Sequence, residues 1–195
     1  MPKFTEQERK KIQNKLLAEG ERLFASIGVK KVTIDDLSNA AGISHSAFYA
    51  FYESKEQLFM DINIRNQEQI YKRLRNLIAE NSSRSPQDLA KLYVTQLQKD
   101  FFADSIISSI DSELLEYIAR KVSPETMKYN DFIDERAVHD LSQAGVKFKY
   151  PLEYVIKSTQ AIFLGISAFK TDHDRDKLAS ILIDALISKL VAAPL

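Results

Sequence analysis

The sequence predicts an all-α protein of about nine helices. Helix start and stop signals recur along the whole chain of 195 residues, whereas no stretch shows the alternating pattern of a strand. Only five glycines and five prolines occur, and none of them interrupts a long helical pattern. Apolar residues make up 45% of the chain, an ordinary share for a globular protein. A chain of this length can hold a small N-terminal domain and one larger helical domain.

Capping residues set the expected helix boundaries. Gly28 and Gly42 each follow a helical pattern, in the place where left-handed backbone ends a helix. Thr33, with an acid three residues later, and Ser54, with a glutamine three residues later, have the spacing of N-terminal caps. Pro86 stands at the first position of the helix after a polar loop. The helices are expected over residues 6–26, 33–42, 44–50, 54–80, 86–102, 106–122 (one or two helices), 123–145, 151–169 and 172–194.

Composition and charge exclude several classes of protein. The absence of cysteine excludes disulfides, zinc fingers and thiolate catalysis. No apolar run approaches the roughly 18 residues that cross a bilayer. No secretory signal is visible, so we expect a cytoplasmic protein with no membrane partner. Net charge is zero, but residues 1–34 carry eight lysines and arginines against four glutamates, and 8 − 4 gives +4. Zero net charge argues against a protein that coats nucleic acid, and any electrostatic footprint for DNA is expected at the N-terminal end and is modest.

Residues 34–51 have the spacing of a helix-turn-helix motif. Such a motif packs two short helices around a tight turn, so it needs apolar residues at fixed points and a small residue at the corner. Gly42 stands at the corner, where its backbone can take a conformation that other residues resist. This predicts a three-helix, DNA-binding head over residues 1–53. The apolar positions around the corner are Leu37, Ala41, Ile43, Phe48 and Phe51.

The outward positions of the second helix carry short or hydrogen-bonding side chains, which suit close approach to the major groove of double-stranded DNA. Thr33 caps the preceding helix, where its hydroxyl and the free amides can meet a phosphate. Lys55 lies in the first turn of the next helix, where the dipole disfavours a cation unless an anion is near. The predicted DNA-binding residues are Thr33, Ser44, His45, Ser46, Tyr49, Ala50 and Lys55.

An alternative interpretation stays open at this point. Helix-turn-helix spacing also arises by chance among helical proteins. In that case Phe48 and Tyr49 are core aromatics, and Lys55 is a solvated surface charge.

Short motifs at a fixed spacing run through about the first 60 residues. They are Leu16-Leu17, Leu23-Phe24, Gly28, Val32-Thr33, Leu37, Ala41-Gly42-Ile43-Ser44, Phe48-Tyr49, Lys55-Glu56 and Leu58-Phe59. With these motifs the chain resembles the tetracycline-repressor (TetR) type of bacterial transcriptional regulators. It departs from the family pattern at Gly20 and Ser38, where alanine is usual. It also departs at Phe51-Tyr52, which replaces a tyrosine or histidine followed by phenylalanine.

The resemblance implies a role for each predicted DNA contact. Thr33, Tyr49 and Lys55 would hold backbone phosphates, while residues 44–46 and Ala50 would face bases or adjacent phosphates. It also implies a repressor that a small ligand releases from a palindromic operator. A ligand that shifts the helix over residues 54–80 would change the spacing of the recognition helices and lower operator affinity. The alternative is a family member that binds DNA without a small-molecule effector.

Residues 54–195 are expected to form a ligand-binding and dimerisation domain. One recognition helix makes few contacts, so a homodimer that reads a palindrome is expected. The last two helices are too apolar for the outer layer of a monomer, and the resemblance implies that they form a four-helix bundle with a second subunit. A core within one subunit is the alternative. The expected interface residues are Val155, Ile156, Thr159, Ile162, Ile166, Phe169, Leu178, Ile181, Leu182, Ala185 and Leu186.

The middle helices are expected to enclose the effector site. Their apolar and aromatic residues would suit a lipophilic or aromatic small molecule. Plain core packing is the alternative for each of these residues. The candidates are Phe101, Phe102, Ile106, Ile110, Leu114, Tyr117, Tyr129, Phe132 and Phe163.

No catalytic residue, cofactor or metal site is expected. The chain has three histidines, and no two of them have the spacing of metal ligands on a helix. The acidic run over residues 172–176 lacks the glycine and distal glutamate of a calcium loop, and acids there suit a helix N-terminus. No glycine-rich phosphate loop or nucleophile elbow occurs. An enzyme is therefore not predicted.

Overall fold

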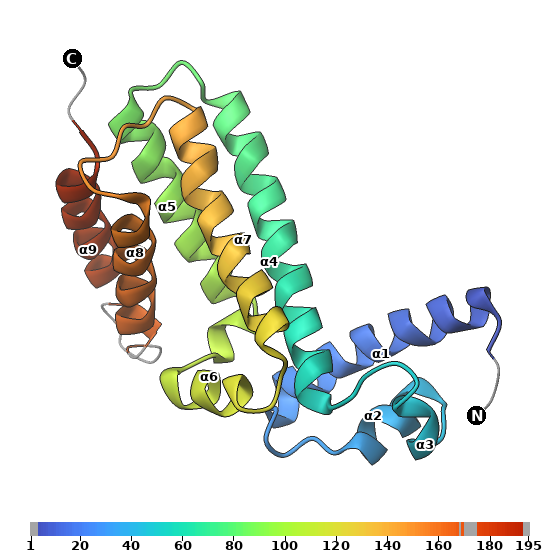
Figure 1. Ribbon diagram of the computed structural model, residues 1–195. Coiled ribbons are helices and arrows are strands. Elements are labelled where there is room, and N and C mark those ends of the chain that lie inside the picture. Colours follow the sequence, from blue (N-terminus) through green and yellow to red (C-terminus); the bar gives the residue numbers. More distant parts are fainter. Residues whose placement is uncertain (1–3, 168, 170–174, 193–195) are drawn as a thin grey trace. The chain divides into compact units, whose positions relative to one another are not determined.

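The computed structural model describes residues 4–167, 169 and 175–192, apart from the side chains of residues 131–134, 137, 167 and 175. Within those residues the chain forms nine α-helices and one 3₁₀-helix, and no strand is formed there (Figure 1). None of the described helices is both long and apolar enough to cross a membrane. The prediction of an all-α fold is confirmed.

Packing divides the chain into two compact units. Unit 1 comprises Met1–Asn66 and Ser105–Met127, and unit 2 comprises Gln67–Asp104 and Lys128–Leu195. The units divide the chain after residues 66, 104 and 127. The functional boundary expected from the sequence lies after residue 53.

Unit 1 holds the N-terminal helices, and local caps define their ends. Thr5 and Glu8 form a capping box at the start of the first helix, and Thr33 and Asp36 form one at the second. Gly28 ends the first helix with a positive φ of 89°. The elements of this unit are α1 (Glu6–Ile27), α2 (Ile34–Ala41), α3 (His45–Phe48), the first part of α4 (Lys55–Glu80), η1 (Ile107–Ser109), α6 (Ser112–Ala119) and the start of α7 (Pro124–Gln143).

One apolar core unites unit 1. α1 packs on α2, and α2 packs on α3. Phe24 of α1 meets Phe59 of α4 edge to face, with ring centroids 5.5 Å apart. Ile106 and Ile118 are buried in the same core, at 0% and 1% exposure, although they lie far along the chain. The head is therefore completed by a segment that follows it by more than forty residues.

Unit 2 is built from the rest of α4 and α7 together with α5 (Pro86–Ala103), α8 (Leu152–Ser167) and α9 (Arg175–Leu190). α9 packs against both α5 and α8. A small core of Val138, Val155, Leu186 and Leu190 joins α7, α8 and α9. The amide of Ala192 donates to the carbonyl of Lys147 at 2.8 Å, which ties the segment after α9 to the loop before α8.

The ends of α3, α8 and α9 differ from the prediction, and α9 ends at Leu190 rather than near residue 194. α3 ends at Phe48 rather than near residue 50, because the amides of Ala50 and Phe51 donate to carbonyls three residues back and tighten the chain into a turn. The segment over residues 106–122 is a 3₁₀-helix followed by α6, with Asp111 capping the latter. α8 ends at Ser167 rather than near residue 169. The acidic run predicted to open the last helix lies largely outside the described residues, at 172–174.

Candidate nucleic-acid interface

The helix-turn-helix packing predicted from the sequence is present in unit 1. Leu37 and Phe48 are fully buried, and Ala41 is nearly so. Ile43 and Phe51 pack against the same core and are half-buried. Gly42 adopts the left-handed conformation, with φ 74° and ψ 36°, that turns the chain between α2 and α3. The inner side of the motif thus faces the core of unit 1.

The opposite edge of the motif is exposed. Ser44, His45 and Ser46 are all open to solvent, and Tyr49 is 49% exposed. Ser44 caps α3 by accepting a hydrogen bond from the amide of Ala47 at 3.2 Å. The hydroxyls of Ser44 and Ser46 lie 3.1 Å apart, so the two share a hydrogen bond. These groups form a polar edge that an incoming ligand can reach.

His45 is held by a residue of the other helix. Its Nδ1 lies 2.6 Å from Oδ1 of Asp35, in the first turn of α2, and both side chains are exposed. The ring of Tyr49 lies 5.6 Å away, centroid to centroid. Because an ionised carboxylate only accepts, Nδ1 donates to it, and Nε2 is left to face a ligand. The two partners are ten positions apart in the sequence, and no local pattern predicted this pairing.

Thr33 is engaged within its own helix cap. Its hydroxyl donates to Oδ2 of Asp36 at 2.7 Å, and its amide donates to the same oxygen at 2.9 Å. The side-chain hydrogen bond from Thr33, followed by the backbone one, lowers the pKa of Asp36. The Asp36 carboxylate therefore stands beside the amides that the sequence argument assigned to a phosphate.

Lys55 is anchored by backbone carbonyls. Its Nζ donates to the carbonyl of Val32 at 2.6 Å and to that of Lys30 at 3.1 Å. These carbonyls explain why a cation occupies the first turn of α4, where the sequence argument required an anion. An ammonium group has three donors, so one remains for a further partner.

Arg9 is a charged residue of this region that the sequence reasoning missed. Its Nη2 donates to the carbonyl of Ala50 at 3.0 Å, and its guanidinium lies 5.1 Å from the ring centroid of Phe51. α1 is thereby fastened to the turn that follows α3. Donor and acceptor are forty-one positions apart in the sequence, so no local pattern predicts this contact.

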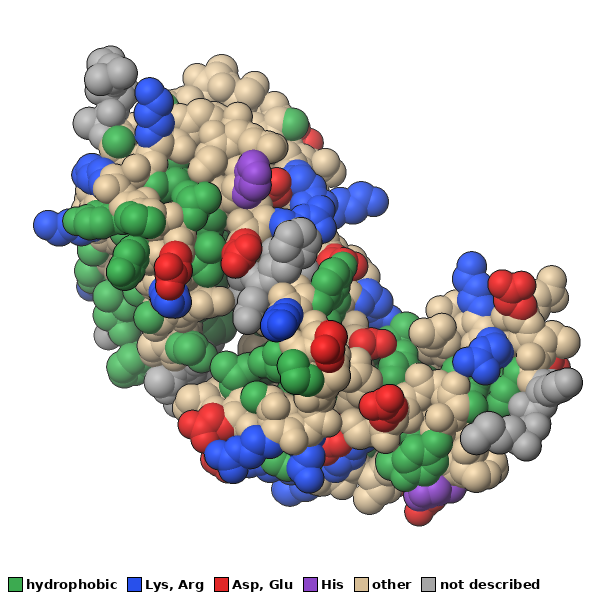
Figure 2. All heavy atoms as spheres, viewed as in Figure 1, with side chains coloured by type: hydrophobic (Ala, Val, Ile, Leu, Met, Phe, Trp, Pro, Cys, Tyr) green, Lys and Arg blue, Asp and Glu red, His purple; other side chains and the backbone are tan. Residues whose placement is uncertain are grey.

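The residues predicted for a dimer interface divide by exposure. Val155, Ile166 and Leu186 are buried within the subunit, as the core alternative expects. Ile156, Thr159, Ile162, Leu178 and Leu182 are half-buried. Phe169, Ile181 and Ala185 are exposed, and apolar side chains gather on the surface over α8 and α9 (Figure 2). The other large apolar side chains exposed there are Leu152, Tyr154 and Leu164.

The residues predicted to line an effector site fall in two different units. Ile106 is fully buried in the core of unit 1, and Ile110, Leu114 and Tyr117 pack against that core. Phe101, Phe102, Tyr129 and Phe163 belong to unit 2. The side chain of Phe132 lies outside the described residues. Four of the candidates are thus associated with core packing, and the rest stay predictions.

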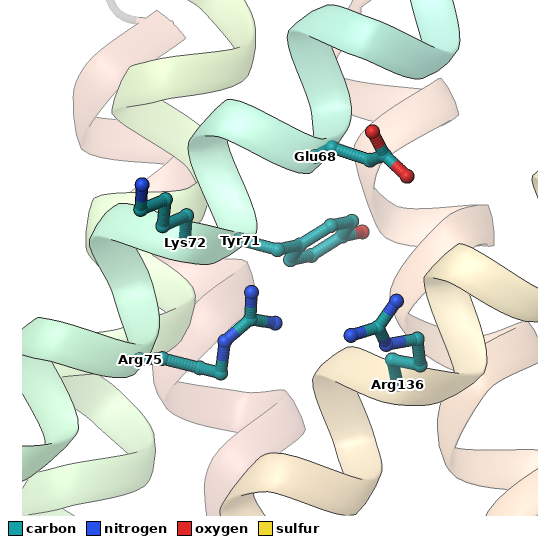
Figure 3. Close-up of a pocket in the computed structure, with 5 residues that line it drawn as sticks. All are labelled: Glu68, Tyr71, Lys72, Arg75 and Arg136. Carbon is teal, nitrogen blue, oxygen red and sulfur yellow. The ribbon is translucent and has the colours of Figure 1, made fainter.

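Unit 2 contains a cavity of about 260 Å³ that the sequence reasoning did not find (Figure 3). It is lined by Glu68, Tyr71, Lys72 and Arg75 of α4 and by Arg136 of α7. The four α4 residues lie on one face of the helix, as their spacing in the sequence predicts. Arg136 follows Arg75 by 61 residues, so its position beside them depends on tertiary packing.

Residues 16–62 match the family described as "Bacterial regulatory proteins, tetR family". Over 62 residues the chain is 36% identical to the "Probable acrEF/envCD operon repressor" of Escherichia coli (strain K12). That alignment covers 32% of this chain and spans only 28% of the length of the relative.

Solved structures resemble the chain over almost its whole length. The transcriptional regulator FadR from Bacillus subtilis, in complex with stearoyl-CoA, has a TM-score of 0.63 at 14% identity, covering 90% of this chain and 97% of that one. RolR, in complex with the ligand resorcinol, has a TM-score of 0.68 at 16% identity, covering 95% and 91%. At such identities the likeness concerns the fold. The N-terminal segment of the chain therefore matches the tetR family of bacterial regulatory proteins, and the chain as a whole shares the all-helical fold of these solved structures.

Proposed function

We propose that this protein is a DNA-binding transcriptional repressor that a small molecule releases from its operator. The observation that carries the proposal is the exposed polar edge over residues 44–46, mounted on a helix-turn-helix whose inner side is buried. The family match covers this same segment. A short helix with hydrogen-bonding side chains at its N-terminus is the arrangement that reads base edges in the major groove.

The predicted contacts have distinct roles in this proposal. Ser44, His45 and Ser46 read bases or the adjacent phosphates, and Ala50 contacts a thymine methyl group. Each good base contact contributes about 1–3 kcal/mol of discrimination. Thr33, Tyr49 and Lys55 position the head on the phosphate backbone, which fixes the register of the protein without reading sequence.

The proposed repressor acts as a homodimer in the cytoplasm. Two heads are needed because a single recognition helix offers too few contacts for specific binding. The exposed apolar residues of α8 and α9, among them Leu164 and Ile181, together with Phe169 just after α8, are the surface that a second subunit would cover. A twofold dimer places its two heads on half-sites about 34–36 Å apart, so the operator is expected to be palindromic.

We assign DNA binding to residues 1–53 and ligand binding with dimerisation to residues 54–195. The cavity in unit 2 favours an effector over a family member that binds DNA alone. The structure of this fold in complex with resorcinol supports a small organic molecule as the effector. If the effector prefers the conformation with misaligned heads, it lowers operator affinity, and DNA lowers effector affinity by the same factor.

Footprinting on the DNA that flanks its own gene tests the proposal directly. Protection is expected over two half-sites related by a twofold axis, at salt concentrations that suppress non-specific binding. Lys91→Ala is the control for removal of a lysine, because Lys91 lies on α5 in unit 2 and is not among the proposed DNA contacts. If the wild type and Lys91→Ala both protected the DNA uniformly, with no preferred site, the result would contradict a sequence-specific regulator.

A further inference from the structure

We infer that Asp35 is a positioning residue that determines which group of a base His45 recognises, because it fixes the place of the imidazole proton. This role rests on the proposed function, since it concerns the base contact assigned there to His45. A neutral histidine can either donate to guanine or accept from an amino group, depending on which ring nitrogen carries the proton. The contact with Asp35 selects between these two possibilities.

The carboxylate of Asp35 binds one nitrogen of the imidazole. Its Oδ1 lies 2.6 Å from Nδ1 of His45, which is the distance of a short hydrogen bond. An ionised carboxylate has no proton to donate, so Nδ1 carries the hydrogen of this bond. The hydrogen bond at one ring nitrogen sets the state of the other, and in the neutral ring Nε2 is therefore left as an acceptor.

Aromatic packing holds the imidazole from a second direction. The ring of Tyr49 lies 5.6 Å from that of His45, centroid to centroid. Tyr49 in turn meets Phe48 edge to face at 5.8 Å, and Phe48 is fully buried. Asp35 stands in the first turn of α2, whose start is fixed by a capping box. The imidazole is thus placed by two helices, while its side chain remains 52% exposed, so a base edge can reach it.

An acceptor at Nε2 excludes most partners on DNA. Phosphate oxygens, N7 and O6 of guanine and O4 of thymine are all acceptors, and two acceptors with no proton between them repel. The donors in the major groove are the exocyclic amino groups, N6 of adenine and N4 of cytosine. His45 therefore reads an amino group of a base, whereas a contact with guanine or with a phosphate requires a proton on Nε2.

NMR spectroscopy of the full chain without DNA measures the position of the proton. Long-range ¹H–¹⁵N spectra distinguish the two ring nitrogens, and His45→Gln identifies the signals of this residue among the three histidines. We expect the neutral ring to carry its proton on Nδ1. A proton on Nε2, or a ring that keeps both protons from about pH 6 to 9, would overturn the inference.

Asp35→Asn tests the cause of that proton position. An amide can donate as well as accept, so the variant should move part of the proton to Nε2. Glu53→Gln is the matched control, because Glu53 is also an exposed acid of unit 1 and its replacement removes the same charge. The control should leave the signals of His45 unchanged. Equal changes in the two variants would show an effect of net charge and would reject the role of Asp35.

Base analogues in the operator test the contact itself, at a pH where the NMR spectrum shows a neutral ring. The base pair at which His45→Ala relaxes preference is rebuilt without its amino group, using purine for adenine or pyrimidin-2-one for cytosine. A second duplex carries a 7-deazapurine, which lacks N7. Relative to the same changes in His45→Ala, loss of the amino group should weaken wild-type binding at least about tenfold, and loss of N7 less than about twofold. The opposite order would overturn the inference.

Asp35→Asn should reduce the effect of the missing amino group at least about threefold, at the same base pair. If Asp35→Ala relaxes a different base pair from His45→Ala, Asp35 contacts DNA itself and does not act through His45. The two proposals fail in different ways. A wild type without a specific footprint rejects the repressor, whatever the NMR spectrum shows. A specific footprint together with a proton on Nε2 rejects only the role of Asp35.

Discussion

The hydroxyl of Tyr117 donates a hydrogen bond of 2.5 Å to Oε1 of Glu56, a carboxylate only 6% exposed in the first turn of α4. That hydrogen bond, helped by burial, raises the pKa of Tyr117 to about 12. Lys30 lies 5.6 Å from the centre of the Tyr117 ring and 2.5 Å from Glu113. Within unit 1, α6 is thus attached both to α4 and to the segment that precedes α2.

Replacement of Tyr117 by phenylalanine should destabilise the protein by about 1–3 kcal/mol, because a buried carboxylate loses its donor. Urea unfolding measures the loss. Since the pKa of Tyr117 is raised in the folded state, the bond contributes fully below pH about 10 and is lost as the pH rises through about 12. The difference between wild type and Tyr117→Phe should therefore stay constant from pH 7 to 9. A difference that vanished in that range would contradict the assignment.

Replacement of Ser38 by alanine should stabilise the protein by about 1 kcal/mol. Ser38 is fully buried in α2, and its hydroxyl finds no hydrogen-bond partner among the described residues. Removing an unsatisfied polar group recovers its desolvation cost, and alanine is also the better helix former. The urea midpoint should rise, whereas Ser82→Ala, in an exposed turn, should change stability by less than about 0.5 kcal/mol.

Replacement of His45 by alanine should relax sequence preference at one position of each half-site, at a cost of about 1–3 kcal/mol on the preferred operator. Binding to non-specific DNA should change little, because the phosphate contacts remain. Footprinting with single-base operator variants measures the effect. If all sequences lost affinity equally, His45 would serve the backbone rather than a base.

Replacement of Lys55 by alanine should weaken binding to all sequences and reduce the salt slope by about one. Lys55 also donates hydrogen bonds to the carbonyls of Lys30 and Val32, so its replacement by alanine also removes contacts that stabilise the fold of unit 1. Lys55→Gln separates the two effects, since an amide can still donate to a carbonyl but carries no charge. A glutamine variant with unchanged stability and an unchanged salt slope would argue against a phosphate contact.

Replacement of Ile181 by aspartate should convert the proposed dimer to monomers and abolish specific footprints. Ile181 is 58% exposed in α9, so a charge there is harmless to the isolated subunit but costly in an apolar interface. Sedimentation velocity measures the mass. Leu115→Asp, at an apolar residue of α6 with 37% exposure, is the control and should leave the mass unchanged. Equal masses for wild type and Ile181→Asp would place the interface elsewhere.

Local chemistry explains what the sequence predicts well. Thr33 and Gly42 fix the ends of α2 through bonds within four residues, so their effect can be read from the chain itself. The buried side of the helix-turn-helix could be predicted for the same reason, because two short helices that are close in the sequence set the spacing of its apolar residues.

Tertiary packing explains what the sequence does not predict. Glu56 and Tyr117 are 61 residues apart in the sequence, so no local pattern predicts their hydrogen bond. Ile106 was predicted to line a ligand pocket but is buried in the core of unit 1, because the apolar pattern of its segment is the same in both cases. The meeting of Arg75 and Arg136 likewise depends on how α4 and α7 pack, for which no local pattern exists.

If His45 reads a base as proposed, its hydrogen bond with Asp35 separates the residue that reads DNA from the residue that orients it. A change at position 35 would tilt the imidazole without altering any group that touches a base. Two proteins with the same recognition helix could then prefer different operators, and new binding preferences could evolve from the neighbouring helix while the reading surface itself stays constant.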